Sequence, residues 1–189
     1  MSSTAGIEGY KGVDNGWLED TQLVTTTTRE LSFFNRTRAV GPSNCNLRQA
    51  GQLPKGEAFE VRAMKLGVAP GGIYGAAGII LDAINVVRAT HQATVSFFVQ
   101  TKPYIDAWPL HAFNFGWHVP SGPIQGAAAA TSYFGQGTPL DVFRLPYPIF
   151  LPENTTFSGV VTWDIIPAGL TTAVTLVWSL IGTHYRTVA

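Results

Sequence analysis

The chain has 189 residues, of which 46% are hydrophobic, 12% aromatic and only 13% charged, about half the charged fraction of an average soluble protein. Twelve Lys and Arg balance twelve Asp and Glu, which excludes an electrostatic nucleic-acid binder and a charge-rich disordered chain. The length suffices for one core, so we expect one domain. A neutral, charge-poor surface favours association, and we expect other subunits to cover much of it; a merely hydrophobic monomer is the alternative.

Residues 1–21 hold four glycines and few clustered apolar residues. They predict an extended N-terminal arm that is ordered only where a neighbour holds it, with a floppy tail as the alternative. The segment lacks the basic and apolar regions of a secretory signal, so none is expected.

Residues 22–189 predict a domain of short strands, because apolar and polar residues alternate in several segments. The clearest alternation puts Phe157, Val161 and Trp163 on one face of a strand. β-branched and aromatic residues dominate these segments, as half-buried pleated surfaces prefer. The strands are predicted at 22–34, 57–66, 93–101, 156–165 and 172–185, with residues 141–150 expected to supply another.

Two apolar segments need separate interpretation. Residues 77–90 have helical spacing of Ile80, Ala83, Ile84 and Val87, which predicts a short helix that covers one end of the β core. Residues 165–183 carry no formal charge and are long enough for a membrane span. They alternate and contain proline and glycine, however, so we interpret them as a pair of strands.

Residues 107–140 form an uncharged, glycine-rich insertion. Its aromatic content argues against disorder, and aromatic residues are enriched at interfaces. We therefore predict a subunit-contact loop; two further strands of the same domain are the alternative. The candidate contact residues are Trp108, Phe113, Phe115, Trp117, Tyr133 and Phe134.

No arrangement of residues predicts catalysis. The four histidines lack metal-ligand spacing, and the single cysteine, Cys45, is interpreted as a structural thiol. The sequence contains no nucleophile elbow or phosphate-binding loop, and its acidic residues are scattered singly except Glu19-Asp20, which leaves no obvious acid/base dyad. We expect no catalytic, cofactor-binding or metal-ligating residues, no cofactor and no enzyme activity; a cupin-like metal enzyme is the weaker alternative.

Short strands, Pro/Gly turns and one helix indicate an all-β single jelly roll or β-sandwich. Three motifs carry a further resemblance: Asn-Leu-Arg-Gln-Ala-Gly-Gln-Leu-Pro at 46–54, Leu-Pro-Tyr-Pro-Ile-Phe-Leu-Pro at 145–152, and Leu-Ile-Gly-Thr-His-Tyr-Arg-Thr-Val at 180–188. In this order they resemble the small jelly-roll major capsid proteins of tailless icosahedral bacteriophages, especially those with an internal membrane.

The resemblance implies a structural virion protein, made in the host cytoplasm, that self-assembles into capsomers of an icosahedral shell. Its implied partners are other copies of itself, other capsid proteins and an internal membrane surface, without direct nucleic-acid binding. We know no counterpart in that family for the Gly/Ala-rich residues 116–139. The alternative from another class is a β-sandwich carbohydrate- or receptor-binding module, in which Trp108, Trp117 and Tyr133 would be exposed stacking platforms.

Overall fold

The computed structural model describes residues 12–38, 45–69, 93–110, 113, 142–165 and 174–187. The secondary-structure elements within these residues are eight β-strands. In chain order the strands are β1 (Gly12–Val24), β2 (Glu30–Phe33), β3 (Glu57–Ala69), β4 (Ala93–Val99), β5 (Lys102–Pro109), β6 (Phe143–Leu151), β7 (Phe157–Trp163) and β8 (Val174–Arg186). The all-β prediction is confirmed for these residues, and β6 lies where 141–150 was expected to supply a strand.

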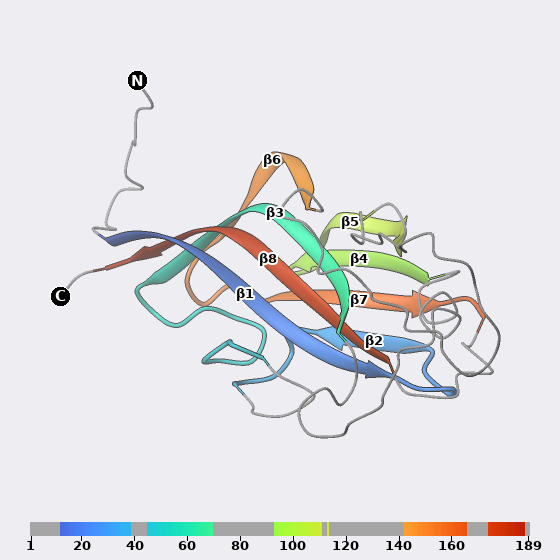
Figure 1. The fold of residues 1–189 in the computed structure, drawn as a ribbon. Helices are drawn as coiled ribbons and strands as arrows, with labels where there is room; N and C mark the ends of the chain where they lie inside the picture. Colours follow the sequence, from blue (N-terminus) through green and yellow to red (C-terminus); the bar gives the residue numbers. More distant parts are fainter. Residues whose placement is uncertain are drawn as a thin grey trace, which may run out of the picture.

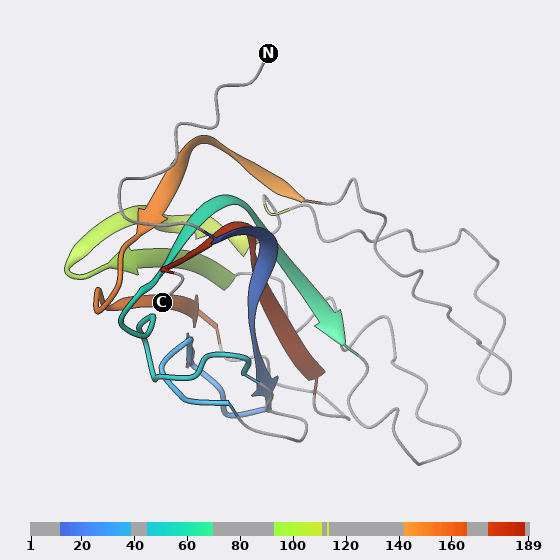
Figure 2. The same cartoon turned by 90° about the vertical axis from the view of Figure 1, so that its left-hand side faces the viewer.

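The strands form two antiparallel four-stranded sheets. Sheet A has the order β1-β8-β3-β6, and sheet B has the order β2-β7-β4-β5. Figure 1 shows β8 between β1 and β3, although it is the last strand of the chain. In Figure 2 the two sheets are seen as separate layers. Each buries one face against the other around one hydrophobic cluster, so the molecule is a β-sandwich.

The central strands of sheet B follow the alternation predicted from the sequence. Buried and half-buried residues alternate along the whole of β4 and β7. Phe157, Val161 and Trp163 are all buried in the core, as predicted for the inward face of β7. Because side chains of a strand point to opposite faces in turn, this register also fixes which face is outside.

The centre of the core is built around Trp178 of β8. Its indole is fully buried, and its ring centroid lies 5.4 Å from that of Phe33 and 6.1 Å from that of Phe97. These rings come from β2 and β4, so the contacts join the two sheets. Gly159 of β7 leaves space for the Trp178 indole, because a Cβ atom at this position would lie 2.4 Å from the ring.

A buried carboxylate ties β1 to the chain that follows β2. Asp20 has no exposed surface; its Oδ2 accepts the backbone N–H of Phe34 at 2.6 Å, and its Oδ1 accepts the Arg36 guanidinium at 2.7 Å. Phe34 has a φ of 65°, a region that costs a non-glycine residue conformational energy. The hydrogen bond to Asp20 holds this unusual turn in place.

Two boundaries differ from the prediction. Residues 12–21, expected in the N-terminal arm, belong to β1 and pair with β8, with Gly12 opposite Arg186. Ladder hydrogen bonds use the backbone, so a glycine-rich segment can pair without a regular apolar pattern. Residues 22–34, predicted as one strand, are divided between β1 and β2, because Thr25 and Thr28 form a turn through backbone and hydroxyl hydrogen bonds.

Four connections leave the sandwich at the same end. In sheet A, Val24 pairs with Val174 and Ala69 with Thr175, so the end of β1, the end of β3 and the start of β8 lie together. A short turn joins Val24 to β2, whose first residue Glu30 lies opposite Thr162, beside the start of β4. The chain segments before β4, β6 and β8 therefore all attach at this end.

Several predictions fall on residues outside the described ones. The helix predicted at 77–90 lies there, as does most of 107–140. Of the strand pair predicted at 165–183, the described part is one strand, β8, which begins at Val174. Among the described residues, none forms a helix of the length and apolarity that a membrane crossing needs.

Candidate functional site

The structure describes two of the six candidate contact residues. Trp108, near the end of β5, is 44% exposed, whereas Phe113 is 1% exposed. Phe115, Trp117, Tyr133 and Phe134 lie outside the described residues.

Phe113 belongs to the core of its own chain instead of a surface open to a second subunit. Its ring centroid lies 4.9 Å from that of Phe143, and the Trp108 ring approaches Phe143 edge-on at 5.4 Å. The three rings close the gap between β5 in sheet B and β6 in sheet A. Sequence alone did not separate this packing role from a contact role, because aromatic residues serve both.

The position of Trp108 depends on a β-bulge. Val95 pairs with Trp108 and Phe97 with Ile105, so β5 carries one extra residue there. Ala107, inside the bulge, has a φ of 48°, and its N–H donates to the Ser96 hydroxyl at 3.0 Å. Bulges redirect side chains at sheet edges. Only Ile105 of β5 is buried, and the other residues of this edge strand are exposed.

A second surface lies on the outer face of sheet A, where residues from four strands stand in cross-strand rows. One row runs from Trp17 on β1 through Ile181 on β8 and Ala63 on β3 to Arg144 on β6. The neighbouring row contains Glu19, Ser179 and Lys65, from β1, β8 and β3. The indole of Trp17 is 64% exposed.

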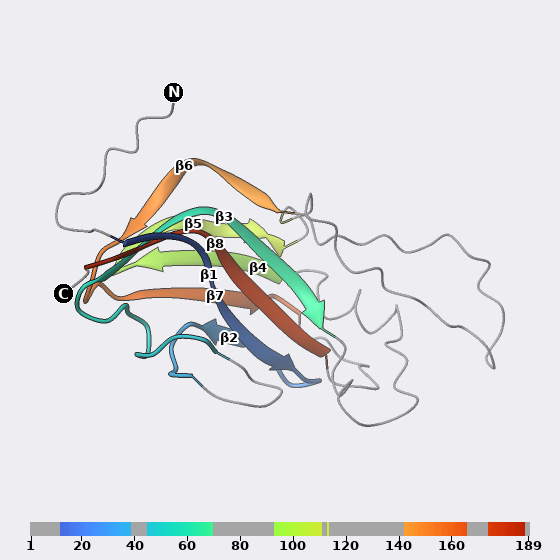
Figure 3. The ribbon, with the colours of Figure 1, turned by 60° about the vertical axis from the view of Figure 1, so that its left-hand side comes forward.

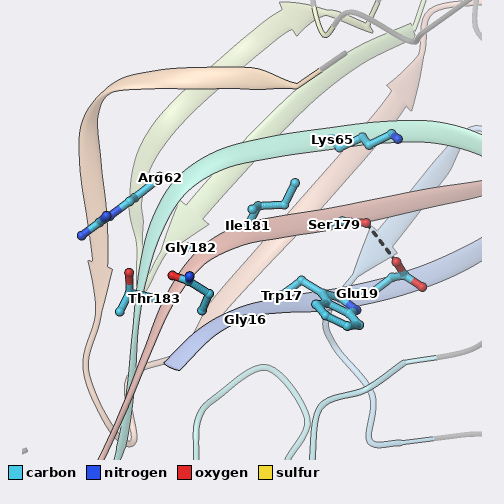
Figure 4. A pocket seen from close by; sticks show the side chains of 10 residues that line it. Gly16, Trp17, Glu19, Arg62, Lys65, Ser179, Ile181, Gly182 and Thr183 are labelled. Carbon is cyan, nitrogen blue, oxygen red and sulfur yellow. Dashed lines mark hydrogen bonds between the residues drawn. The ribbon is translucent and has the colours of Figure 1, made fainter. Parts of the chain in front are cut away.

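These rows border two adjoining hollows, of about 510 Å³ and about 780 Å³. Both are lined by Arg62, Lys65 and Ile181, so they lie next to each other, and we call the two together the sheet A trough. Figure 4 shows Ile181 between Trp17 on β1 and the two β3 cations. The trough is also lined by Glu19 of β1, Glu60 of β3, Ser179 of β8 and Arg144 of β6.

An arch of β6 forms one wall of the trough. Ile149 pairs with Val61 and Arg144 with Ala63, so Leu145–Pro148 lie opposite Arg62 alone. Figure 3 shows β6 rising away from β3. Two prolines in this stretch, Pro146 and Pro148, cannot donate to a ladder. The inserted residues therefore leave room above β3.

The acidic groups of the trough already have partners. Oε1 of Glu60 accepts a hydrogen bond from Nε of Arg62 at 2.6 Å, and this contact raises the pKa of Arg62. Oε2 of Glu60 accepts a hydrogen bond from the Tyr185 hydroxyl. Glu19 accepts the Ser179 hydroxyl at 3.0 Å. Within the described residues, neither Lys65 nor Arg144 forms an ion pair. Serine and tyrosine hydroxyls are neutral, so both carboxylates keep their charge, and the three cations Arg62, Lys65 and Arg144 against two carboxylates leave the lining with one positive charge in excess.

Two titratable residues outside these surfaces are explained by packing. Cys45 is buried, and desolvation raises the pKa of its thiol, as suits a structural residue. His184 lies 3.2 Å from Glu57, but desolvation outweighs this carboxylate and lowers the pKa of the imidazole. No group of three or more metal-ligating side chains occurs in the described part of the chain.

Sequence reasoning missed the trough. Trp17, Lys65 and Arg144 come from strands far apart in the chain, and only the strand order of sheet A brings them into two neighbouring rows. The one local signal was the tryptophan in a polar, glycine-containing segment, Asn15-Gly16-Trp17. The chain matches no family model, no curated protein and no solved structure at a significant level.

Proposed function

We propose that this chain is a jelly-roll major capsid subunit, which self-assembles through its loops and edges into the capsomers of an icosahedral virion shell. The observation that carries the proposal is the pairing of the strands. β1 pairs with β8, β2 with β7, β3 with β6, and β4 with β5. A long hairpin rolled into two sheets produces these pairings, which is how the two Greek keys of an eight-stranded jelly roll arise.

The arrangement of the connections supports the same role. Three of the segments that leave the common end of the sandwich are long, and one of them contains most of the uncharged residues 107–140. Loops on a rigid scaffold commonly carry the contacts of a protein. Trp108 lies where this segment begins, with nearly half of its surface exposed. We assign the subunit contact to this end, with Trp108, Trp117 and Tyr133 as its aromatic anchors.

The charge balance suits repeated contacts between copies of one chain. A heterologous contact that closes around an axis produces rings and shells from one kind of subunit. Burying an unpaired charge in such a contact costs several kcal/mol, roughly. Residues 107–140 contain no formal charge, and the whole chain is neutral, so association there avoids this penalty.

Assembly and its dependence on the aromatic anchors test the proposal. We expect the purified chain to sediment as trimers, pentamers, hexamers or larger particles, with rings or shells in negative stain. Trp117→Ala and Tyr133→Ala should each weaken assembly by about 2 kcal/mol or more, as buried aromatic anchors do. Trp17→Ala, on the outer face of sheet A, is the matched control and should leave assembly unchanged.

A stable monomer at micromolar concentration would overturn the shell proposal. If instead both variants keep the wild-type oligomeric state and lose binding to glycans, the aromatic residues are stacking platforms of a carbohydrate- or receptor-binding module. Circular dichroism of each variant checks that the β-sandwich is intact before sedimentation is compared.

A further inference from the structure

We infer that the sheet A trough is a binding site for a short anionic oligosaccharide whose sugars carry carboxylates. The site extends from Trp17 on β1 to Arg144 on β6, with Lys65 between them on the neighbouring row. This inference does not rest on the shell proposal, because it uses the outer face of sheet A alone.

The charges of the trough define the charge of the ligand. Both oxygens of the Glu60 carboxylate accept hydrogen bonds, from Arg62 and from Tyr185, and Glu19 accepts one from Ser179. Lys65 and Arg144 have no acidic partner among the described residues. Charge-assisted hydrogen bonds from such cations to a carboxylate are stronger than neutral ones, and arginine can form two in parallel. The lining carries three cations and two carboxylates, so it has one positive charge in excess, and Lys65 and Arg144 are the cations that a negatively charged ligand would meet.

The exposed tryptophan defines the second property of the ligand. Trp17 offers a large flat apolar surface with a polar N–H at its edge, and the indole is 64% exposed within the trough. A pyranose ring has an apolar face of C–H groups and a rim of hydroxyls, so it can stack on the indole while its hydroxyls meet the polar residues around it. Ser179, Thr183 and Asn15 also line this part of the trough.

The location on a sheet face favours a sugar over an extended peptide. A peptide gains affinity from a sheet by adding a strand to its edge, where backbone groups are free. At the trough, the backbone of β8 is already paired on both sides, with β1 and β3. A ligand over β8 and β3 therefore meets side chains, because both strands are paired on both sides. From β1 to β6 the row crosses three strand spacings, about 14 Å in all, which is the length of a short oligosaccharide.

Calorimetric titration of the full chain, in the assembly state in which it purifies, tests the inference. The probes are trigalacturonate as the anionic sugar, maltotriose as a neutral trisaccharide and hexaglutamate as an acidic peptide. We expect trigalacturonate to bind at least about tenfold more tightly than maltotriose, as one strong charge-assisted contact provides. Hexaglutamate should bind more weakly than trigalacturonate, because it offers no ring for Trp17.

Single substitutions identify the site. Trp17→Ala, Lys65→Gln and Arg144→Gln should each weaken trigalacturonate binding by about fivefold or more. All three residues lie on the outer face, so the fold and the oligomeric state should not change. Lys102→Gln is the matched control: this cation lies over the Tyr104 ring on β5, in the other sheet, and should leave binding unchanged.

Four outcomes would overturn the inference. They are no binding of trigalacturonate at millimolar concentration, equal binding of maltotriose, tighter binding of hexaglutamate, and binding that the three variants leave unaltered. Each result is independent of whether the chain forms shells.

Discussion

At the scale of single residues, Asp20 is a buried polar group that connects two parts of the chain. Its carboxylate is fully buried and accepts hydrogen bonds from the Phe34 backbone and the Arg36 guanidinium. Removing one partner of a buried charged pair destabilises the fold by more than the pair itself contributes to stability, because the remaining groups stay buried without a partner. Asp20 thus has a structural role that its short, polar sequence context does not reveal.

Asp20→Ala should therefore lower the free energy of unfolding by about 3–5 kcal/mol. It leaves the buried Phe34 N–H without its acceptor at a position with a φ of 65°. Urea denaturation followed by tryptophan fluorescence measures the change. Asp106→Ala, at an exposed position of β5, is the control and should change stability by less than about 0.5 kcal/mol. A loss of less than about 1 kcal/mol for Asp20→Ala would show that Asp20 does not hold this turn.

His184 makes stability depend on pH. It contacts Phe59 and faces Glu57 from β3, Asp14 from β1 and Arg186 on its own strand. Burial, the largest effect, lowers its folded-state pKa below 6.5. The unfolded chain then binds a proton more readily, so this contribution is present above pH 6.5 and is lost as pH falls towards the folded pKa.

The difference in unfolding free energy between wild type and His184→Gln should therefore decrease as the pH is lowered below about 6.5. One proton limits the slope to about 1.4 kcal/mol per pH unit. Urea denaturation of both proteins between about pH 7.5 and pH 5.5 measures it, and carboxylates common to both largely cancel in the difference. A difference that stays constant or grows on acidification would contradict the argument.

At the scale of elements, β7 is the strand whose register the sequence predicts best. Trp163→Ala removes a buried indole from the inward face and should destabilise the protein by about 3–5 kcal/mol. Thr162→Ala, on the opposite face of the same strand, should cost less than about 1 kcal/mol. Thermal unfolding of the two variants compares the faces. An unchanged melting temperature for Trp163→Ala would mean that the register is reversed.

Strands in which burial alternates regularly were predictable, whereas the first part of β1 was not. Along β4 and β7 the alternation of burial follows the alternation of apolar and polar side chains in the sequence. β1 was missed over Gly12–Thr21 because its partner β8 lies at the other end of the chain and pairs through the backbone. The division between β1 and β2 was hidden because threonine suits both strands and turns.

The candidate surfaces were predictable only in part. Trp108 was identified as a contact residue and has an exposed side chain, whereas Phe113 was identified in the same way and is buried. Phe143 of β6 packs on both rings, and no local pattern in the sequence encodes these contacts or their different exposure. The sheet A trough needed the strand order itself, because its residues are adjacent only across strands.

At the scale of the whole molecule, neutrality determines how the proposed assembly should respond to salt. With equal numbers of acidic and basic residues, little long-range attraction or repulsion is available for salt to screen. Association through an uncharged aromatic surface depends on hydrophobic burial, which sulfate strengthens. The two effects separate this kind of contact from one based on ion pairs.

Sedimentation velocity should therefore show nearly the same degree of assembly from about 50 mM to about 500 mM sodium chloride. Ammonium sulfate at the same ionic strength should increase it. Dissociation on raising sodium chloride would instead indicate ion pairs across the contact, contrary to the assignment to residues 107–140.

The central place of β8 in sheet A also has a consequence for biosynthesis. β8 ends at Arg186, yet β1 and β3 both pair with it and not with each other. While the ribosome is still producing the chain, two strands of this sheet must wait for a partner that emerges last. Such non-local pairing makes folding slow, on the order of milliseconds to seconds. Sheet A therefore cannot be completed until β8 has left the ribosome, and a nascent chain that stalls before residue 174 exposes the apolar faces of β1 and β3 to cellular chaperones.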